Sequence, residues 1–311
     1  MITAEMVKTL REKTGARLMD CKHALTSTNG DFEKALDWVK QKNLDLGAAT
    51  TSKSATEGLL GFTESDGALT IVEMSASTDF ATQNQEFKDR LNLVTKTAHD
   101  NKIDSVEKLN SAILASGMSV QDSIKELAGL IGENIAIRRV VRVEGNFGYY
   151  IHFDHKQGAI VELDGVAGDL AQKIGKDLSM HVVFAKPLYL TRAEVPAANV
   201  EREKSVIDAR LKDDPKNAGK GQFILDRIVE GQLNKSFSKT VLLDQPYYRE
   251  EKKTVSKILE ELGVKVTRFS YLYTKEPEVE CYGNDPVPCS QCRNPDQKGI
   301  CSCRKPKIKN A

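Results

Sequence analysis

The sequence predicts an α+β protein made of several small units, and three observations support this prediction. Apolar residues first recur at helical spacing within residues 1–52. Strand-like runs and amphipathic helices then alternate twice, over residues 53–145 and again over residues 146–275. The chain has 311 residues, whereas one domain usually takes roughly 100–200. We therefore expect two or three domains with separate cores, followed by a tail at residues 276–311.

The composition indicates a folded protein with a protein partner. Hydrophobic residues make up 40% of the chain and charged residues 29%, and 45 basic residues nearly balance 44 acidic ones. A nucleic-acid-binding surface usually brings a basic excess, so no direct nucleic-acid contact is expected. No run approaches the ~20 apolar residues that cross a bilayer, and the first residues do not resemble a secretory signal. These features favour a cytoplasmic protein with no membrane contact.

The first segment, residues 1–52, is predicted to form a three-helix module and a linker. Thr3 can cap the first helix, Gly15 stands where that helix should end, and Asp31 can cap the third helix. Residues 47–55 are small and polar, which indicates a linker or a weak helix. Three short helices bury only a modest core, so the module suits a binding surface better than a deep active site.

The two segments that follow are predicted to be core subdomains of mixed structure. In residues 53–145, Gly58-Leu-Leu-Gly61 is interpreted as a short turn, and the arginines of the second strand are expected on its outer face. In residues 146–275, the charged insertion 193–235 predicts an antiparallel helical hairpin around residues 213–219. The predicted strands are residues 69–75, 135–143, 149–153, 159–163 and 264–273, and the predicted helices are residues 86–98, 120–131, 169–186 and 253–262.

The sequence offers little support for catalysis. It has no glycine-rich loop ending in Lys and Ser or Thr, and no Gly-x-Ser-x-Gly elbow. His152 and His155 are close in sequence but lack a nearby third ligand, so they are interpreted as ordinary hairpin residues. No catalytic residue is assigned, and the chain is not expected to be an enzyme.

One string, residues 77–84, has two interpretations. As local structure, Thr78 or Asp79 would cap the following helix while Phe80 folded back into the core. Alternatively, Asp79 and Phe80 form an exposed loop tip. An exposed ring makes sense when a partner buries it, which would contribute roughly 1.5–3 kcal/mol. Both interpretations remain open at this point.

The cysteines are concentrated near the C-terminus, apart from Cys21. In a reducing compartment such a cluster is more typical of metal ligands than of disulfides. Four thiolates can bind one tetrahedral zinc ion, and Cys289-x-x-Cys292 is a good half-site with Cys301-Ser-Cys303 as a less usual second half. The alternative is a reduced, disordered tail kept in solution by its lysines and arginines.

Several short strings, in order along the chain, resemble the bacterial elongation factor Ts family. The resemblance extends from Met1 to about Tyr273. It is carried by Thr14-Gly-Ala-Arg-Leu-Met-Asp-Cys-Lys-His-Ala-Leu25, Asn29-Gly-Asp31, Glu57-Gly58, Thr78-Asp-Phe80, Ile131-Gly-Glu-Asn-Ile135, Arg138-Arg139, Met180-His-Val182, Lys186-Pro187 and Val229-Glu-Gly231.

The resemblance implies a fold and a function. The fold would be a ubiquitin-associated-like three-helix module, two related α+β core subdomains and a helical hairpin inserted in the second. The function would be guanine-nucleotide exchange on elongation factor Tu, in its GDP-bound and nucleotide-free forms, during translation elongation. Thr78, Asp79, Phe80 and Ala81 would enter the GTPase and dislodge its magnesium, and Met19 and Asp20 would contact its nucleotide-binding domain. Exchange itself would require no cofactor. The alternative is a translation-associated adaptor without exchange activity.

The chain departs from the family pattern near the same string. Ser75-Ala-Ser77 replaces an Asn-Cys-Glu-like run, Ala81 replaces a valine, and Gln83 replaces a common basic residue. Arg17 and Leu18 stand where Gly and Met are usual. These changes are expected to alter partner affinity more than mechanism, because the Asp-Phe pair is retained.

Overall fold

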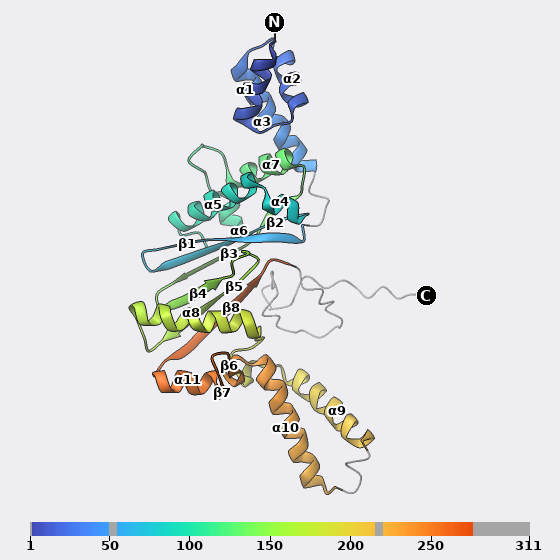
Figure 1. Cartoon of the computed structure of the whole chain (residues 1–311), viewed down its shortest axis with the longest axis vertical. Helices are drawn as coiled ribbons and strands as arrows, with labels where there is room; N and C mark the ends of the chain where they lie inside the picture. Colours follow the sequence, from blue (N-terminus) through green and yellow to red (C-terminus); the bar gives the residue numbers. More distant parts are fainter. Residues whose placement is uncertain (1, 50–54, 215–219, 276–311) are drawn as a thin grey trace. The chain divides into compact units, whose positions relative to one another are not determined.

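The computed structural model describes residues 2–49, 55–214 and 220–275 and has an α+β architecture (Figure 1). It divides into two compact units. Unit 1 comprises the chain up to Gly145, joined by residues 153–156 and by the segment that begins at Tyr273. Unit 2 comprises residues 146–152 and 157–272.

Unit 1 begins with three helices, as the sequence predicts: α1 (Ala4–Thr14), α2 (Leu18–Ser27) and α3 (Phe32–Ala49). The Thr3 side chain accepts a hydrogen bond from the Met6 N–H and caps α1, which ends at Gly15 in the left-handed region. Asp31 accepts from the Lys34 N–H at the start of α3. Because α3 continues to Ala49, the weak-helix interpretation holds up to that residue, and positions 50–54 lie outside the described residues.

The sheet of unit 1 is antiparallel, with strand order β1-β2-β3. Its strands are β1 (Glu57–Ser65), β2 (Ala68–Ala76) and β3 (Ile135–Glu144). The predicted turn at Gly58-Leu-Leu-Gly61 is wrong, because these residues pair with β2 inside β1. A β-carbon at Gly61 would lie 2.5 Å from the Thr95 Oγ1 atom. Gly61 therefore serves close packing between a strand and a helix rather than chain reversal.

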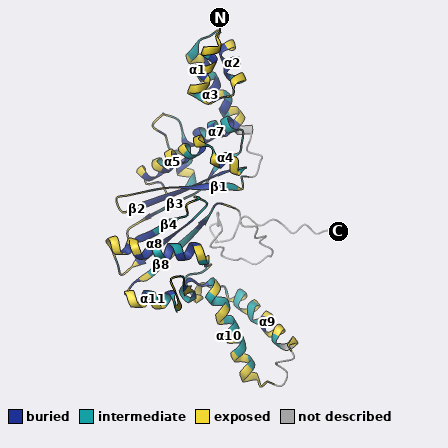
Figure 2. Ribbon diagram, in the orientation of Figure 1, coloured by how far each residue is buried: buried dark blue, intermediate teal, exposed yellow. Residues whose placement is uncertain are grey.

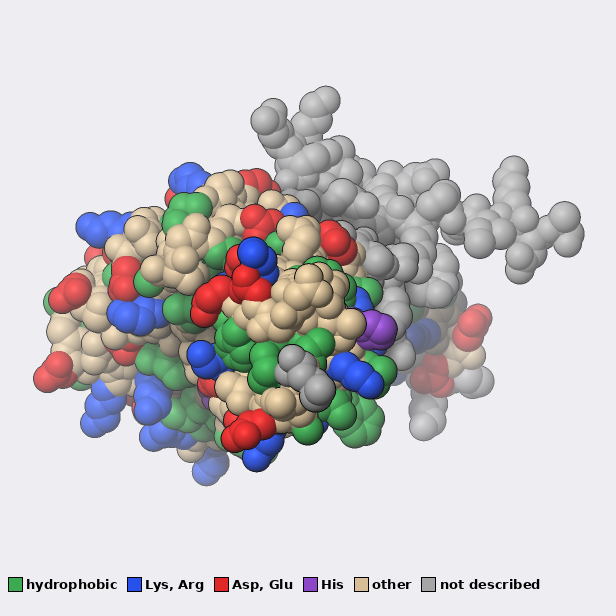
Figure 3. All heavy atoms as spheres, turned by 90° about the horizontal axis from the view of Figure 1, so that it is seen from above, with side chains coloured by type: hydrophobic (Ala, Val, Ile, Leu, Met, Phe, Trp, Pro, Cys, Tyr) green, Lys and Arg blue, Asp and Glu red, His purple; other side chains and the backbone are tan. Residues whose placement is uncertain are grey.

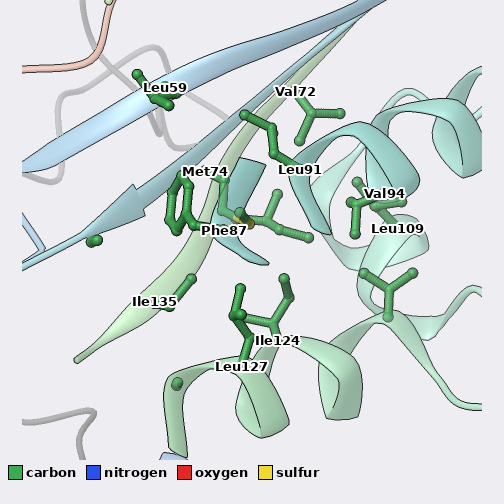
Figure 4. Packing of buried hydrophobic residues seen from close by; sticks show 14 of the residues in the cluster. Leu59, Val72, Met74, Phe87, Leu91, Val94, Leu109, Ile124, Leu127 and Ile135 are labelled. Atoms are coloured by element: carbon green, nitrogen blue, oxygen red, sulfur yellow. The ribbon is translucent and has the colours of Figure 1, made fainter. Parts of the chain in front are cut away.

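Helices cover one face of this sheet and form a core with it (Figure 4). They are α4 (Asp79–Gln83), α5 (Gln85–Asp100), α6 (Val106–Ser111) and α7 (Val120–Ile131). Met74 of β2 and Phe87 of α5 are fully buried at its centre, where Ile124 and Leu127 of α7 approach them. The sequence predicts α5 and α7, whereas α4 and α6 are too short to show a helical period.

The arginines of β3 do not lie on an outer, solvent-facing side, which corrects the sequence-based expectation. Arg139 donates two hydrogen bonds to Glu73 Oε2, at 3.0 and 2.6 Å, and Glu73 is only 1% exposed. A β-bulge where Glu73 and Met74 pair with β3 places Arg138 beside the same carboxylate. A buried carboxylate needs charged donors, and β3 supplies them. Arg142 likewise donates to Thr70.

Unit 2 contains a second antiparallel sheet, with strand order β4-β5-β8, and a long helix packed on it. The strands are β4 (Phe147–Ile151), β5 (Gln157–Asp164) and β8 (Lys265–Tyr273), and the helices are α8 (Gly168–Ala185) and α11 (Val255–Leu262). A small hairpin of β6 (Pro246–Tyr247) and β7 (Glu250–Thr254) precedes α11 and was not predicted. Because β7 ends at Thr254, which caps α11, that helix begins at Val255 rather than at Lys253.

The insertion in unit 2 forms the two predicted helices, α9 (Ala197–Asp213) and α10 (Gln222–Thr240), which run side by side. The middle of the connecting turn, residues 215–219, lies outside the described residues. Most described side chains of both helices are exposed or half-buried (Figure 2). At the base, Arg192 donates to Asp244 at 2.8 and 2.9 Å and to Asn234 at 2.9 Å. These bonds tie α10 to the short helical turns Arg192–Glu194 and Leu242–Asp244.

Candidate partner-binding site

The string that the sequence singled out lies at the junction between β2 and α4. The Thr78 hydroxyl accepts a hydrogen bond from the Ala81 N–H at 3.3 Å and so caps α4. It also donates to Glu133 Oε1 at 3.3 Å, just beyond the end of α7. The predicted cap at Thr78 is confirmed, and the same side chain is also hydrogen-bonded to the chain just beyond α7.

Phe80 is 85% exposed, so of the two interpretations the one in which its ring folds back into the core is wrong. The reason is the helical phase of α4. Ala81 and Thr82 face the core and are buried, and the Thr82 hydroxyl donates to the Asp79 carbonyl at 2.7 Å. With those two positions turned inward, Asp79 and Phe80 must face outward. The result is a solvent-exposed ring on a short helix that the core holds in place.

Asp79 lies beside Phe80 and is also exposed. Its negative charge reaches Lys275, another residue of unit 1: the pKa of Lys275 is raised, mainly by Glu57 at 3.2 Å and, more weakly, by Asp79. The outer face of α4 therefore presents a carboxylate next to an aromatic ring. In a complex with a partner protein, the ring can insert between apolar side chains, and the carboxylate can interact with polar groups.

The N-terminal module presents a second apolar surface at the start of α2. Leu18 is 51% exposed and Met19 is 56% exposed. The sequence analysis assigned Met19 to partner binding but mentioned Leu18 only as a departure from the family pattern. The position of Leu18 directly before Met19, at the start of the helix, could have indicated that both side chains belong to one surface. Figure 3, which views the structure from the N-terminal end, shows apolar side chains gathered among charged ones.

Asp20 is partly buried and already has a partner. Its carboxylate accepts a hydrogen bond from Lys42 Nζ at 2.5 Å, and Lys42 lies 5.0 Å from the centre of the Trp38 ring. This pair fastens α2 to α3. A contact between Asp20 and a partner would have to share or replace the Lys42 interaction, whereas Met19 is available without rearrangement.

The end of α7 lies beside both surfaces. Gly132 ends α7 in the left-handed region, and a β-carbon there would lie 3.0 Å from the Arg17 guanidinium, directly before α2. The next residue, Glu133, accepts the hydrogen bond from Thr78. The Arg17 side chain thus lies next to Gly132, and Thr78 is hydrogen-bonded to the following residue, Glu133, in unit 1.

Neither a metal centre nor a membrane span is found in the described ranges. Within residues 2–49, 55–214 and 220–275, no group of three or more His, Cys, Asp or Glu side chains could hold a metal ion. The proposed zinc ligands Cys289, Cys292, Cys301 and Cys303 lie outside the described residues. Among the described helices, none has both the length and the apolar character required to cross a bilayer.

The described residues present an exposed aromatic ring and a separate apolar surface, and exposed apolar groups of this kind are typical of proteins that bind other proteins. A sequence model of the family described as Elongation factor TS matches residues 77–276. The chain is 37% identical over 281 residues to elongation factor Ts of Paracoccus denitrificans (strain Pd 1222), covering 88% of this chain and 93% of that protein. It is 34% identical over 276 residues to elongation factor Ts of Halothermothrix orenii (strain H 168 / OCM 544 / DSM 9562), covering 86% and 91%. The chain belongs to the elongation factor Ts family of translation elongation factors.

Proposed function

We propose that the chain is a guanine-nucleotide exchange factor for elongation factor Tu. It binds the GDP-bound GTPase, promotes GDP release by dislodging magnesium, and holds the nucleotide-free form. The observation that carries the proposal is Phe80, an 85% exposed ring on a helix anchored by buried neighbours. The proposal includes a ubiquitin-associated-like topology for the three N-terminal helices and a cytoplasmic location, where translation takes place.

The mechanism requires no covalent step, so the chain acts as a non-enzymatic factor. A GTPase holds GDP through a phosphate-binding loop and a magnesium ion. By thermodynamic linkage, a factor that weakens GDP binding must bind the empty GTPase more tightly than the GDP-bound GTPase. The ratio of these two affinities equals the factor by which GDP binding is weakened. Phe80 acts as an apolar wedge in the GTPase, and the Asp79 carboxylate perturbs the polar groups around the metal. Thr78 and Ala81 hold these two residues in place.

The N-terminal module supplies the second contact. Met19 packs against the nucleotide-binding domain of the GTPase, and Asp20 supports it through α2. Removal of the segment before Lys53 should weaken partner binding strongly, as calorimetry would measure. Unchanged affinity in that truncated protein would rule out this part of the proposal.

The function is tested by the release of a fluorescent GDP analogue from elongation factor Tu. The wild-type protein should accelerate release, and Asp79→Asn should lose most of the acceleration at high magnesium but little when magnesium is chelated. Spontaneous release at saturating protein would instead indicate the alternative function, a translation-associated adaptor without exchange activity. An identical Asp79→Asn deficit at every magnesium concentration would remove the role assigned to Asp79.

The C-terminal tail adds a separate proposal, which rests on sequence spacing alone. Cys289, Cys292, Cys301 and Cys303 supply four sulfurs for one structural zinc ion. Exchange needs no cofactor, so zinc binding and nucleotide exchange are expected to be independent.

A further inference from the structure

Helices α3 and α7 approach each other through two glycines. A β-carbon at Gly47 of α3 would lie 1.9 Å from the carbonyl oxygen of Lys125 in α7. Reciprocally, a β-carbon at Gly129 of α7 would lie 1.9 Å from the carbonyl oxygen of Asn43 in α3. Each helix thus places a glycine against the backbone of the other helix. In α3 the contacted residue Asn43 lies four positions before Gly47, and in α7 the contacted residue Lys125 lies four positions before Gly129. No other residue type fits at either position without separating the helices.

These two helices hold the two candidate surfaces of the site. Through Lys42, α3 binds the Asp20 carboxylate of α2, next to Met19. Glu133, two residues beyond the end of α7, accepts the hydrogen bond from the Thr78 hydroxyl, and Thr78 lies next to Phe80. The glycine contact therefore lies on the structural route from Met19 to Phe80, although neither glycine belongs to either surface.

We infer that Gly47 and Gly129 are positioning residues for nucleotide exchange, because they fix Met19 and Phe80 at one separation. This inference rests on the proposed function. Two contacts on one rigid body reinforce each other, since the first contact brings the second to its target at a high effective concentration. A body already held in its binding geometry also loses less conformational freedom on docking. If the helices separate, each surface survives but the two no longer engage the GTPase together.

The substitution Gly129→Ala tests the inference, and Gly47→Ala is its reciprocal variant. Gly231→Ala is the matched control, because Gly231 lies inside α10 with no atom within 4 Å of its added β-carbon. Alanine is the better helix former, so helix propensity alone would make all three variants neutral or stabilising. Only the two variants at the crossing should change the spacing of α3 and α7.

A measurement without a partner comes first. Spin labels carried by ketone-bearing amino acids at the exposed positions Lys22 and Asn92 report the separation of α2 and α5 by pulsed electron resonance. A narrow distance distribution is expected in the wild-type protein and in Gly231→Ala, and a shifted or broadened one in Gly129→Ala and Gly47→Ala. If either crossing variant keeps the wild-type distribution while remaining folded, the glycine contact does not fix the spacing.

Exchange on elongation factor Tu then tests the functional part. Gly129→Ala should lower the apparent affinity about 10-fold or more, and Gly231→Ala should leave it unchanged. In the Gly129→Ala background, Met19→Ala should lower the apparent affinity much less than it does in the wild-type protein, because the Met19 contact no longer acts together with the Phe80 contact. Equal Met19→Ala effects in both backgrounds would overturn the inference. If the wild-type protein does not accelerate release, the proposed function fails, and the label distances still decide whether the crossing sets the spacing.

Discussion

The Thr78 hydroxyl joins α4 to the chain beyond α7: it donates to Glu133 Oε1 at 3.3 Å while accepting from the Ala81 N–H at the same distance. One side-chain oxygen therefore accepts from a free N–H at the start of the helix that carries Phe80. Its hydroxyl hydrogen also connects this helix to Glu133, just beyond α7. The placement of the exposed ring depends on this pair of hydrogen bonds as well as on the buried Ala81.

Substituting Thr78 should weaken exchange through this attachment. Thr78→Ala removes the cap and the bond to Glu133, and loss of an N-cap typically costs about 1 kcal/mol of helix stability. Thr78→Ser keeps a hydroxyl with the same donor and acceptor capacity. We expect a several-fold slower GDP release for alanine and near wild-type release for serine. Amide hydrogen exchange of residues 79–83 should rise only in Thr78→Ala, and equal protection in both variants would contradict the role of the hydroxyl.

Phe80→Ala should remove most exchange activity and leave the melting temperature unchanged, because an 85% exposed ring contributes little to its own core. Phe184→Ala is the matched control, since Phe184 is 77% exposed on α8 of unit 2. The control should retain exchange. A lowered melting temperature with normal exchange in Phe80→Ala would mean that the ring serves folding instead.

Most of the longer elements of the fold, with β1 as an exception, were predicted from the sequence because their residues repeat at one period and many of their ends carry caps. Thr3, Gly15 and Asp31 bound helices where predicted. Gly58-Leu-Leu-Gly61 misled the prediction because glycine is common in turns, whereas here Gly61 faces Thr95 across a helix–strand contact. That contact joins residues far apart in sequence, so local pattern could not show it.

The sequence singled out the residues of the candidate site but did not give its geometry. Local sequence left two orientations for Phe80 open, and the choice depends on Ala81 and Thr82 packing against a core built from distant elements. The attachment of Thr78 to Glu133 spans 55 positions in sequence. Similarly, nothing near Arg139 indicates the buried Glu73 that draws it inward.

A buried histidine in unit 2 predicts acid sensitivity. The Nε2 atom of His181 donates a hydrogen bond to Gln245 Oε1 at 3.0 Å, and its Nδ1 atom accepts one from the Tyr248 N–H at 3.3 Å. Burial lowers the pKa of His181, although the bond to Gln245 partly opposes this shift. Protonation would place a hydrogen on Nδ1 facing the Tyr248 N–H. The folded state thus disfavours the charged ring.

The sign of the effect follows from proton uptake on unfolding. The pKa of histidine in the unfolded chain is about 6.5, and the pKa of His181 in the folded protein is lower, so the unfolded state binds more protons near and below pH 6.5. The neutral His181 ring therefore contributes to the free energy of unfolding at pH values above its pKa in the unfolded chain. This contribution is lost as the pH falls towards its lower pKa in the folded protein. Urea unfolding between about pH 7.5 and about pH 5.5 should show a smaller loss of stability in His181→Gln than in the wild-type protein. The exposed His23→Gln is the control, and equal losses in all three proteins would contradict the assignment.

Deleting the helical hairpin, residues 193–235, with a short linker should spare basal exchange. The Thr78–Phe80 segment and Met19 both belong to unit 1, whereas α9 and α10 belong to unit 2. Near the deletion, Gln245 donates to the carbonyl groups of Ala185 and Lys239, which remain in the shortened chain and can keep the base of α10 in place. GDP release should stay within about 2-fold of the wild-type rate, less than the loss of one hot-spot contact would cause. Complete loss in a folded deletion protein would assign the hairpin an essential part in exchange.

The cysteine-rich tail should bind about one zinc ion per chain, because four thiolates form one tetrahedral site. Cys289 and Cys292 supply the half-site with the more usual spacing. The double variant Cys289→Ser/Cys292→Ser should lose the zinc, as measured by elemental analysis of protein purified without chelators. Its exchange rate should be unchanged, since the metal is proposed to be structural. Cys21→Ala is the control, because Cys21 lies buried in the N-terminal module and should not alter zinc content. Zinc-free wild-type protein whose tail thiols all react freely would leave the solvated, reduced tail as the better description.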